Sequence, residues 1–370
     1  MKNTKKKILI VSLSAGAGHV KTAEALVKTA ELKYPDLECR HIDMYNYITS
    51  SFKHAAVTSY DLLAKKTPKL WGALYEKTDG PKAVSRFNKI TKQLKQINSK
   101  KLYTEIQKFK PDAIISTHFL PGDMLLNQPK KYTYSAPVTM LITDYDLHNF
   151  WVSEKISHYF VATEKIKSKL IQRGHANKDK VTVSGIPVNP KFYEPVDKDL
   201  LKKELELKNQ PTILLLSGGS GLIKTDEIVK KLFSLEQNFN LVTIAGKNTK
   251  LEDKLKKITP PKNIHYQAIG WTDKMEEYIK LSDLVITKPG GLTTTECMVT
   301  GAPIIAIDPV PGQEEANAKF ITENNLGWVA LNHADVVHQA DKYLKGELKH
   351  NQIKIKKPAG QIVLEKITNL

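Results

Sequence analysis

The stretch "KKILIVSLSAGAGHVKTAEAL", residues 6–26, sets the fold class at the start of the chain. Its apolar run Ile8–Val11 is short and β-branched, as in a buried parallel strand, and the segment "TAEAL" opens a good helix. Gly16 and Gly18 therefore lie in a strand-to-helix turn, where backbone N–H groups point outward and the helix dipole begins. His19 stands at the mouth of this turn. The third glycine of the dinucleotide-binding fingerprint is missing, so that fingerprint does not apply.

Short apolar runs alternate with amphipathic segments along both halves of the chain. The expected strands are KILIVSL, DAIISTH, VTMLITD and HYFVATE, then TILLLSG, LVTIAG, IHYQAIG, LVITKPG and PIIAID. This alternation predicts an α/β protein with two doubly wound parallel sheets, each covered by helices. The proline-rich segment 183–199 is the expected linker. We expect domains at 1–188 and 189–370, with the last helix able to cross back, and strand carboxyl ends on a shared cleft.

The composition describes a globular protein without a membrane-spanning segment. The 370 residues are 41% hydrophobic and 26% charged, and no apolar run reaches 18 residues. The N-terminal apolar run leads directly into the glycine turn, so we interpret it as the first strand and not as a signal peptide. Cys39 and Cys297 lie far apart without metal-ligand spacing, which favours a reducing cytoplasm.

The net charge of +17 is concentrated near the end of the first third of the chain. Between Lys53 and Lys110 there are fourteen Lys or Arg and four Asp or Glu, a net of +10. Such an excess predicts an anionic partner, either acidic membrane lipids or nucleic acid. Segment 82–100 places apolar side chains at spacings of three and four opposite basic ones, as in a membrane-surface helix. The residues expected at the membrane are Arg86, Phe87, Lys89, Ile90, Lys92, Leu94 and Lys95. An ordinary helix with a solvated lysine face is the alternative.

Three glycine-bearing loops follow strands in the second half. "SGGSG" starts at Ser217, "KPGG" ends at Gly291 before a threonine-rich helix, and "PGQEEAN" follows the strand PIIAID. Glycine turns that lead into helices can hold a diphosphate with backbone N–H groups, and the helix dipole favours its charge. The Walker pattern is absent, so a P-loop ATPase or kinase is excluded.

The ordered set of these motifs resembles one enzyme family. "GAGH", "SGGSG", "IGWTDKMEEYI", "TKPGGLTTTE" and "PGQEEAN" are similar to the monogalactosyldiacylglycerol synthase and processive diacylglycerol glucosyltransferase family, relatives of the peptidoglycan enzyme MurG. "ITDYDLHNFWV" resembles that family's first-domain stretch. The resemblance implies a GT-B fold and inverting transfer of glucose or galactose from a UDP-sugar to diacylglycerol. It also implies a peripheral enzyme on the cytoplasmic side of the membrane.

The resemblance further implies which residues hold the donor. The match places Glu314 on the ribose hydroxyls, Gln313 on the sugar and the backbone of Ile269 at the uracil. The residues implied for donor binding are Gly218, Gly219, Gly246, Ile269, Gly270, Met275, Gly290, Gly291, Thr294, Glu296, Gln313, Glu314 and Asn317. Neither a cofactor nor a metal is expected, because helix N-termini can stabilise the leaving diphosphate.

Inversion requires a base that removes the acceptor's hydroxyl proton. His19 is the side chain we expect in that role, because an imidazole titrates near working pH. Asp144 is the alternative, either as the base itself or as the group that orients the imidazole. Gly16, Gly18 and His118 are expected to line the acceptor loop, although His118 also suits a polar cap at a strand end.

Several rival interpretations use the same residues. Asp144 and Asp146 have the D-x-D spacing of a different glycosyltransferase fold and, with His148, could bind Mg²⁺ or Mn²⁺. The charge alone suggests a nucleic-acid-binding protein, but no recognised nucleic-acid-binding motif is present. A MurG-type transferase would use a polyprenyl-linked acceptor, and a UDP-sugar epimerase would need no acceptor at all.

Overall fold

The computed structural model describes residues 5–14, 16–47, 72, 77, 79, 100–218 and 224–370. The chain divides into two compact units. The first comprises Met1–Pro190, Pro311–Gln313 and Lys357–Leu370, and the second comprises Lys191–Val310 and Glu314–Lys356. The seven residues predicted to contact a membrane, and Gly219, lie outside the described residues.

The first unit is built on a six-stranded parallel sheet of order β2-β1-β3-β4-β5-β6. Its strands are β1 (Lys6–Ser12), β2 (Leu37–Asp43), β3 (Ala113–Ser116), β4 (Val138–Leu141), β5 (His158–Val161) and β6 (Val181–Val183). Its helices are α1 (Ala17–Lys33), α6 (Lys100–Phe109), α7 (Phe119–Leu126), α8 (Glu164–Gln172) and α16 (Ala359–Thr368). The central strands β3, β4 and β5 are buried at every residue because helices cover the sheet on both faces.

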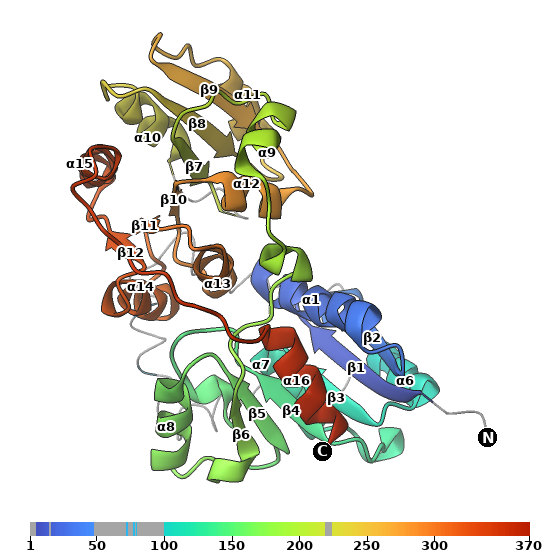
Figure 1. Cartoon of the computed structure of the whole chain (residues 1–370). Helices are drawn as coiled ribbons and strands as arrows, with labels where there is room; N and C mark the ends of the chain where they lie inside the picture. Colours follow the sequence, from blue (N-terminus) through green and yellow to red (C-terminus); the bar gives the residue numbers. More distant parts are fainter. Residues whose placement is uncertain are drawn as a thin grey trace. The chain divides into compact units, whose positions relative to one another are not determined.

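The last helix, α16, belongs to the first unit. Its residues Val363, Leu364 and Ile367 share one apolar core with Ile8 and Ile10 of β1. Figure 1 shows α16 beside α1. The C-terminal helix is therefore part of the sheet's cover and returns to the unit that contains the start of the chain.

The second unit repeats the architecture with the sheet order β12-β11-β10-β7-β8-β9. Its strands are β7 (Thr212–Leu216), β8 (Phe239–Ile244), β9 (Ile264–Ile269), β10 (Leu284–Thr287), β11 (Ile304–Ala306) and β12 (Gly327–Val329). Its helices are α9 (Lys198–Glu204), α10 (Thr225–Leu232), α11 (Thr249–Lys256), α12 (Met275–Leu281), α13 (Gly291–Thr300), α14 (Gln313–Glu323) and α15 (His333–Leu344). Both sheets are parallel throughout, which confirms the predicted α/β class with two doubly wound domains.

Each sheet has one topological switch point, where the strand order reverses direction. In the first unit it lies between β1 and β3, and in the second between β7 and β10. Ligands of open α/β sheets bind beyond the strand carboxyl ends at such points. We therefore expect ligands to bind at the loops after β1 and β3 and at the loops after β7 and β10.

Candidate active site

The first switch point holds His19 in the opening turn of α1. Gly16 caps this helix with φ 109°, a backbone conformation that side-chain-bearing residues rarely adopt. The Nδ1 atom of His19 lies 2.8 Å from the Thr117 carbonyl oxygen and 2.9 Å from the Thr143 hydroxyl oxygen. The Thr117 hydroxyl in turn donates to the carbonyl of His19 at 3.0 Å. The loops after β1, β3 and β4 thus meet at one imidazole.

A second histidine ring packs against the first. The ring of His118 meets that of His19 edge to face, with centroids 4.6 Å apart, and stacks on Phe119 at 4.3 Å. His118 caps α7, because its Nδ1 accepts the backbone N–H of Leu120 at 3.0 Å. His118 therefore caps the helix that follows the strand, and its place in the acceptor loop stays a prediction.

Both rings are held in their neutral forms by their surroundings. Desolvation by burial lowers the pKa of His19 to about 4, although the hydrogen bond to the Thr117 carbonyl opposes this effect. Desolvation, followed by the neighbouring His19, holds the pKa of His118 well below its usual value. His19 nevertheless remains partly exposed at the surface of the unit. With a pKa of about 4, its imidazole is uncharged at physiological pH.

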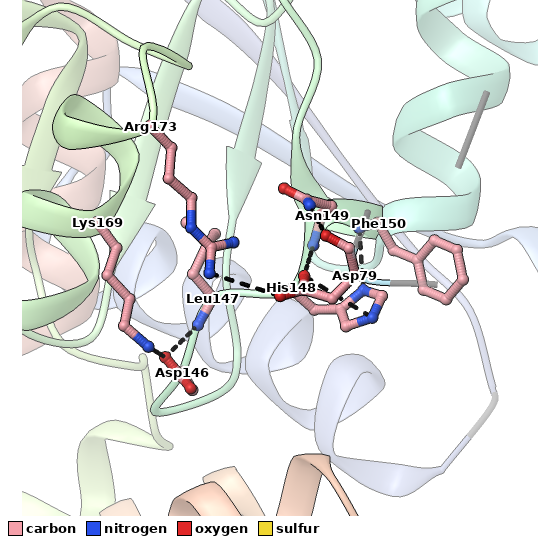
Figure 2. A network of polar contacts seen from close by, with 8 residues as sticks. All are labelled: Asp79, Asp146, Leu147, His148, Asn149, Phe150, Lys169 and Arg173. Carbon is pink, nitrogen blue, oxygen red and sulfur yellow. Dashed lines mark hydrogen bonds and ion pairs between the residues drawn. The ribbon is translucent and has the colours of Figure 1, made fainter. Parts of the chain in front are cut away.

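The loop after β4 carries the D-x-D candidates. Thr143 and Asp144 are each 5% exposed. Asp146 forms an ion pair with Lys169 of α8 and accepts the backbone N–H of Leu147 at 2.8 Å. Figure 2 shows this carboxylate directed at the lysine. Among the described residues no group of three or more His, Cys, Asp or Glu is arranged to hold a metal ion.

A polar network fixes the remainder of that loop. Asp79 accepts the backbone N–H of Asn149 at 2.9 Å and pairs with Arg173 at 3.5 Å (Figure 2). His148, at 3% exposure, accepts the Phe150 N–H at 3.1 Å through Nδ1. These contacts tie the loop to α8 and to Asp79, and so hold the segment that carries Thr143 and Asp144 in place.

The second switch point brings Gly218 and Lys288 together. Gly218 has φ 74°, and a Cβ placed there would lie 3.9 Å from Cδ of Lys288. The Lys288 side chain is only 13% exposed, and its Nζ lies 3.7 Å from Oε2 of Glu314. The same Oε2 accepts the backbone N–H of Val310 at 2.7 Å. Lys288 is a residue that the sequence analysis did not single out, although it stands inside the quoted motif "TKPGG".

The N-terminus of α13 opens at this same point. Its N-cap is Gly290, which has no side chain with which to cap the helix. No acidic residue occupies the first turn. The backbone N–H groups of such a turn suit an anionic ligand. Thr294 in the following turn is 1% exposed, and its hydroxyl has no hydrogen-bond partner within the described part of the chain.

The remaining donor candidates lie on or beside elements of the second sheet, and all of them except Gln313 belong to the second unit. Ile269 ends β9 and Gly270 follows it, while Met275 begins α12. Gly246 follows β8, and Gln313 begins α14. Glu296 lies on α13, and Asn317 on α14 is fully buried. The loops after β7, β10 and β11 are neighbours in the sheet, whereas β9 lies at its far edge, so the structure places Ile269 and Gly270 two strands away from Gly218.

Comparison with known proteins agrees with this geometry. Residues 19–188 match the family model "Monogalactosyldiacylglycerol (MGDG) synthase", and residues 212–365 match the "Glycosyltransferase family 28 C-terminal domain". The processive diacylglycerol beta-glucosyltransferase of Bacillus pumilus is 32% identical over 95% of this chain and 90% of its own length. That of Bacillus licheniformis is 29% identical with the same coverage.

Solved structures show the same architecture at low identity. MurG of Acinetobacter baumannii has a TM-score of 0.56 at 16% identity, covering 99% of this chain and all of that one. The UDP-GlcNAc 2-epimerase of Neisseria meningitidis, solved with UDP-GlcNAc bound, has a TM-score of 0.60 at 13% identity, covering 98% and 100%.

Two parallel, doubly wound units define a protein of the two-domain GT-B fold, as the sequence predicted. Within that fold class, the chain belongs to the family of the processive diacylglycerol beta-glucosyltransferases. The family expected from the motifs is thereby confirmed.

Proposed function

We propose that this protein transfers a hexose from a UDP-sugar to the hydroxyl group of diacylglycerol, with inversion at the anomeric carbon. The observation that carries the proposal is the 32% identity to a processive diacylglycerol beta-glucosyltransferase over 95% of the chain. The relatives' names favour UDP-glucose over UDP-galactose as the donor. A MurG-type acceptor is less well supported, because MurG shares 16% identity and the fold alone.

His19 supplies the base in this proposal. The hydroxyl oxygen of diacylglycerol attacks the anomeric carbon while its proton passes to the imidazole, and the bond from the sugar to the diphosphate breaks. Nδ1 of His19 is occupied by Thr117 and Thr143, so Nε2 is the nitrogen that receives the proton. Asp144 is the alternative base, and its carboxylate accepts a hydrogen bond from the Gln313 side chain at 2.6 Å. A carboxylate only accepts hydrogen bonds, so Asp144 does not orient the imidazole through Nε2 while that nitrogen presents its lone pair. Gly16 shapes the turn that presents His19 to the acceptor, whereas Gly18, expected in that turn, lies in the first turn of α1 beside His19.

The second switch point supplies the donor site. The diphosphate of the UDP-sugar fits the α13 N-terminus beside Gly218, where backbone N–H groups and the helix dipole stabilise the charge of the leaving group. Lys288 adds a positive charge at the same place, held in the described arrangement by Glu314. When the donor binds, the diphosphate takes over Lys288, and the Glu314 carboxylate becomes available to the ribose hydroxyls.

The chemistry we assign to Lys288 and α13 needs no metal ion. A lysine and a helix N-terminus together provide the electrostatic stabilisation that a divalent cation supplies in other transferases. Asp146 is neutralised by Lys169, and a cation would have to compete with that lysine. We therefore propose transfer without a metal or cofactor.

The acceptor lies in a bilayer, so the enzyme must reach the membrane surface. Among the described helices, none combines the length and apolar character required to cross a bilayer. We propose that the basic, apolar-laced segment 82–100 binds anionic lipids at the cytoplasmic face and that nucleic acid is not a partner.

A UDP-release assay tests the proposal directly. The protein is mixed with UDP-glucose and vesicles of anionic phospholipid, with or without diacylglycerol. We expect UDP release only when diacylglycerol is present. Conversion of the donor without any acceptor would indicate an epimerase, and activity restricted to UDP-GlcNAc with a polyprenyl-linked acceptor would indicate a MurG-type enzyme.

A further inference from the structure

The hydrogen bonds at His19 determine which of its ring nitrogens carries the proton. Its Nδ1 lies within hydrogen-bond distance of two oxygens, the Thr117 carbonyl at 2.8 Å and the Thr143 hydroxyl at 2.9 Å. A carbonyl oxygen only accepts, so the Nδ1 facing it must carry the hydrogen. A neutral imidazole has one N–H, and Nε2 of His19 therefore presents a lone pair.

The two oxygens are fixed from three neighbouring strands. Thr117 follows β3, and its own N–H donates to the Val11 carbonyl of β1 at 3.0 Å. Its hydroxyl donates to the carbonyl of His19 at 3.0 Å, which ties the loop to α1. Thr143 follows β4 and is 5% exposed. The Thr117 carbonyl and the Thr143 hydroxyl together form a cradle around Nδ1. Because β1, β3 and β4 are adjacent in the sheet, this cradle is part of the rigid scaffold.

The neighbouring His118 has the opposite tautomer. Its Nδ1 accepts the N–H of Leu120 at 3.0 Å, so its proton resides on Nε2. Its ring packs edge to face against the ring of His19, with the two centroids 4.6 Å apart, and so covers one side of that ring. Of the two packed rings, His19 is the one whose Nε2 can accept a proton.

We propose that Thr143 is a positioning residue: with the Thr117 carbonyl it holds His19 in the Nδ1–H form and stabilises the imidazolium when Nε2 takes the acceptor's proton. This inference rests on the proposed function, because it assumes that His19 is the base. Every bond and proton in this step is accounted for. The acceptor oxygen forms its bond to the anomeric carbon, the diphosphate leaves with the electron pair, and Nδ1 keeps its hydrogen throughout. Here two neutral oxygens fix the tautomer of the imidazole and stabilise its charged form, as a carboxylate does for many catalytic histidines.

Three variants separate positioning from mere structure. Thr143→Val removes the hydroxyl at nearly constant volume, and Thr143→Ser keeps it. Thr139→Val is the matched control, because Thr139 is a fully buried threonine on β4 whose hydroxyl also makes a hydrogen bond, to the Ile114 carbonyl at 3.1 Å. Glycolipid formation gives kcat and the KM for UDP-glucose, and ¹⁵N-histidine NMR of the resting protein gives the tautomer of His19.

We expect Thr143→Val to lower kcat by about 10- to 100-fold, the usual range for a hydrogen bond to a charged group. The KM for UDP-glucose should not change, because every donor residue except Gln313 belongs to the second unit. Thr143→Ser should recover most of the rate, and Thr139→Val should keep it. Wild-type His19 should be Nδ1-protonated, and Thr143→Val should add signal from the Nε2-protonated form.

Two results would overturn the assignment. One is a Thr143→Val variant whose kcat stays within about twofold of the Thr139→Val control. The other is a wild-type His19 protonated at Nε2. The NMR measurement needs no turnover, so it distinguishes this failure from a failure of the proposed function. A protein that made no glycolipid, yet held His19 in the Nδ1–H form, would refute the function and leave the cradle intact.

Discussion

The acid limb of the pH–rate profile is the most quantitative consequence of the packed histidine pair. A general base works only when it is unprotonated, so activity is present above its pKa and lost as the pH falls through it. Burial lowers the pKa of His19 to about 4. About nine-tenths of His19 would then be unprotonated at pH 5, against about 3% for an imidazole with the ordinary value of 6.5. The two cases differ by about 30-fold in rate at that pH.

The assay is the initial rate of glycolipid formation between pH 4 and 8, using vesicles with a fixed fraction of phosphatidylglycerol, whose phosphodiester stays ionised over this range. Samples returned to pH 7.5 before assay control for irreversible unfolding. We expect kcat/KM for diacylglycerol to remain near its plateau at pH 5 and to fall below it. His19→Ala should lower kcat by roughly two to four orders of magnitude and remove this limb, while UDP affinity stays unchanged. An acid limb centred between pH 6 and 7, or near-normal turnover of the variant, would refute the reasoning.

The other predictions concern the donor site and the membrane. Glu314→Ala should raise the KM for UDP-glucose more than it lowers kcat, because ribose contacts bind ground and transition states alike; an unchanged KM with a collapsed kcat would move Glu314 into the chemistry. Lys288→Met should weaken binding of UDP far more than binding of uridine, measured by calorimetry, with the exposed Lys274→Met as control; equal losses for both ligands would take Lys288 away from the diphosphate. EDTA should leave most turnover intact, and loss that Mg²⁺ or Mn²⁺ restores would favour a metal at Asp144 and Asp146. Reversing Arg86, Lys89, Lys92 and Lys95 to glutamate should release the protein from anionic vesicles without changing UDP binding, since each such charge contributes on the order of 1 kcal/mol near an acidic surface; binding that ignores salt and lipid charge would contradict this.

The central strands could be predicted because a strand that is buried on both faces has a nearly continuous run of apolar residues. β3, β4 and β7 lie in continuous apolar runs, and each is buried along its whole length. The edge strand β9 was predicted from the run IHYQAIG, but the other three edge strands were missed. β2 alternates between half-buried and exposed residues in its first half, and β6 and β12 are three residues long. A short strand that is covered on one side only has too few apolar residues to stand out from a loop.

The residues of the candidate site likewise divide into those with a local sequence signal and those without one. His19 and the α13 turn could be found because their glycines and strand-end positions are local features. Thr143 meets His19 across 124 positions of sequence, and Lys288 meets Glu314 across 26, so neither contact has a local signal. Lys288 did offer one clue, since a lysine that ends a buried strand beside a glycine turn is out of place in an ordinary core. His118 shows the limit of residue type alone, because a buried histidine at a strand end became a helix cap.

The central claim is inverting transfer of a hexose onto diacylglycerol, and the product itself tests it most directly. The wild-type protein is incubated with diacylglycerol and, separately, UDP-glucose, UDP-galactose and UDP-GlcNAc, and the lipid is analysed by mass spectrometry and by the anomeric proton coupling in NMR. We predict hexosyl diacylglycerol from UDP-glucose with the large coupling of a β-linkage, formed from an α-linked donor. An α-linked product, or a lipid whose mass never increases with any of the three donors, would contradict the account.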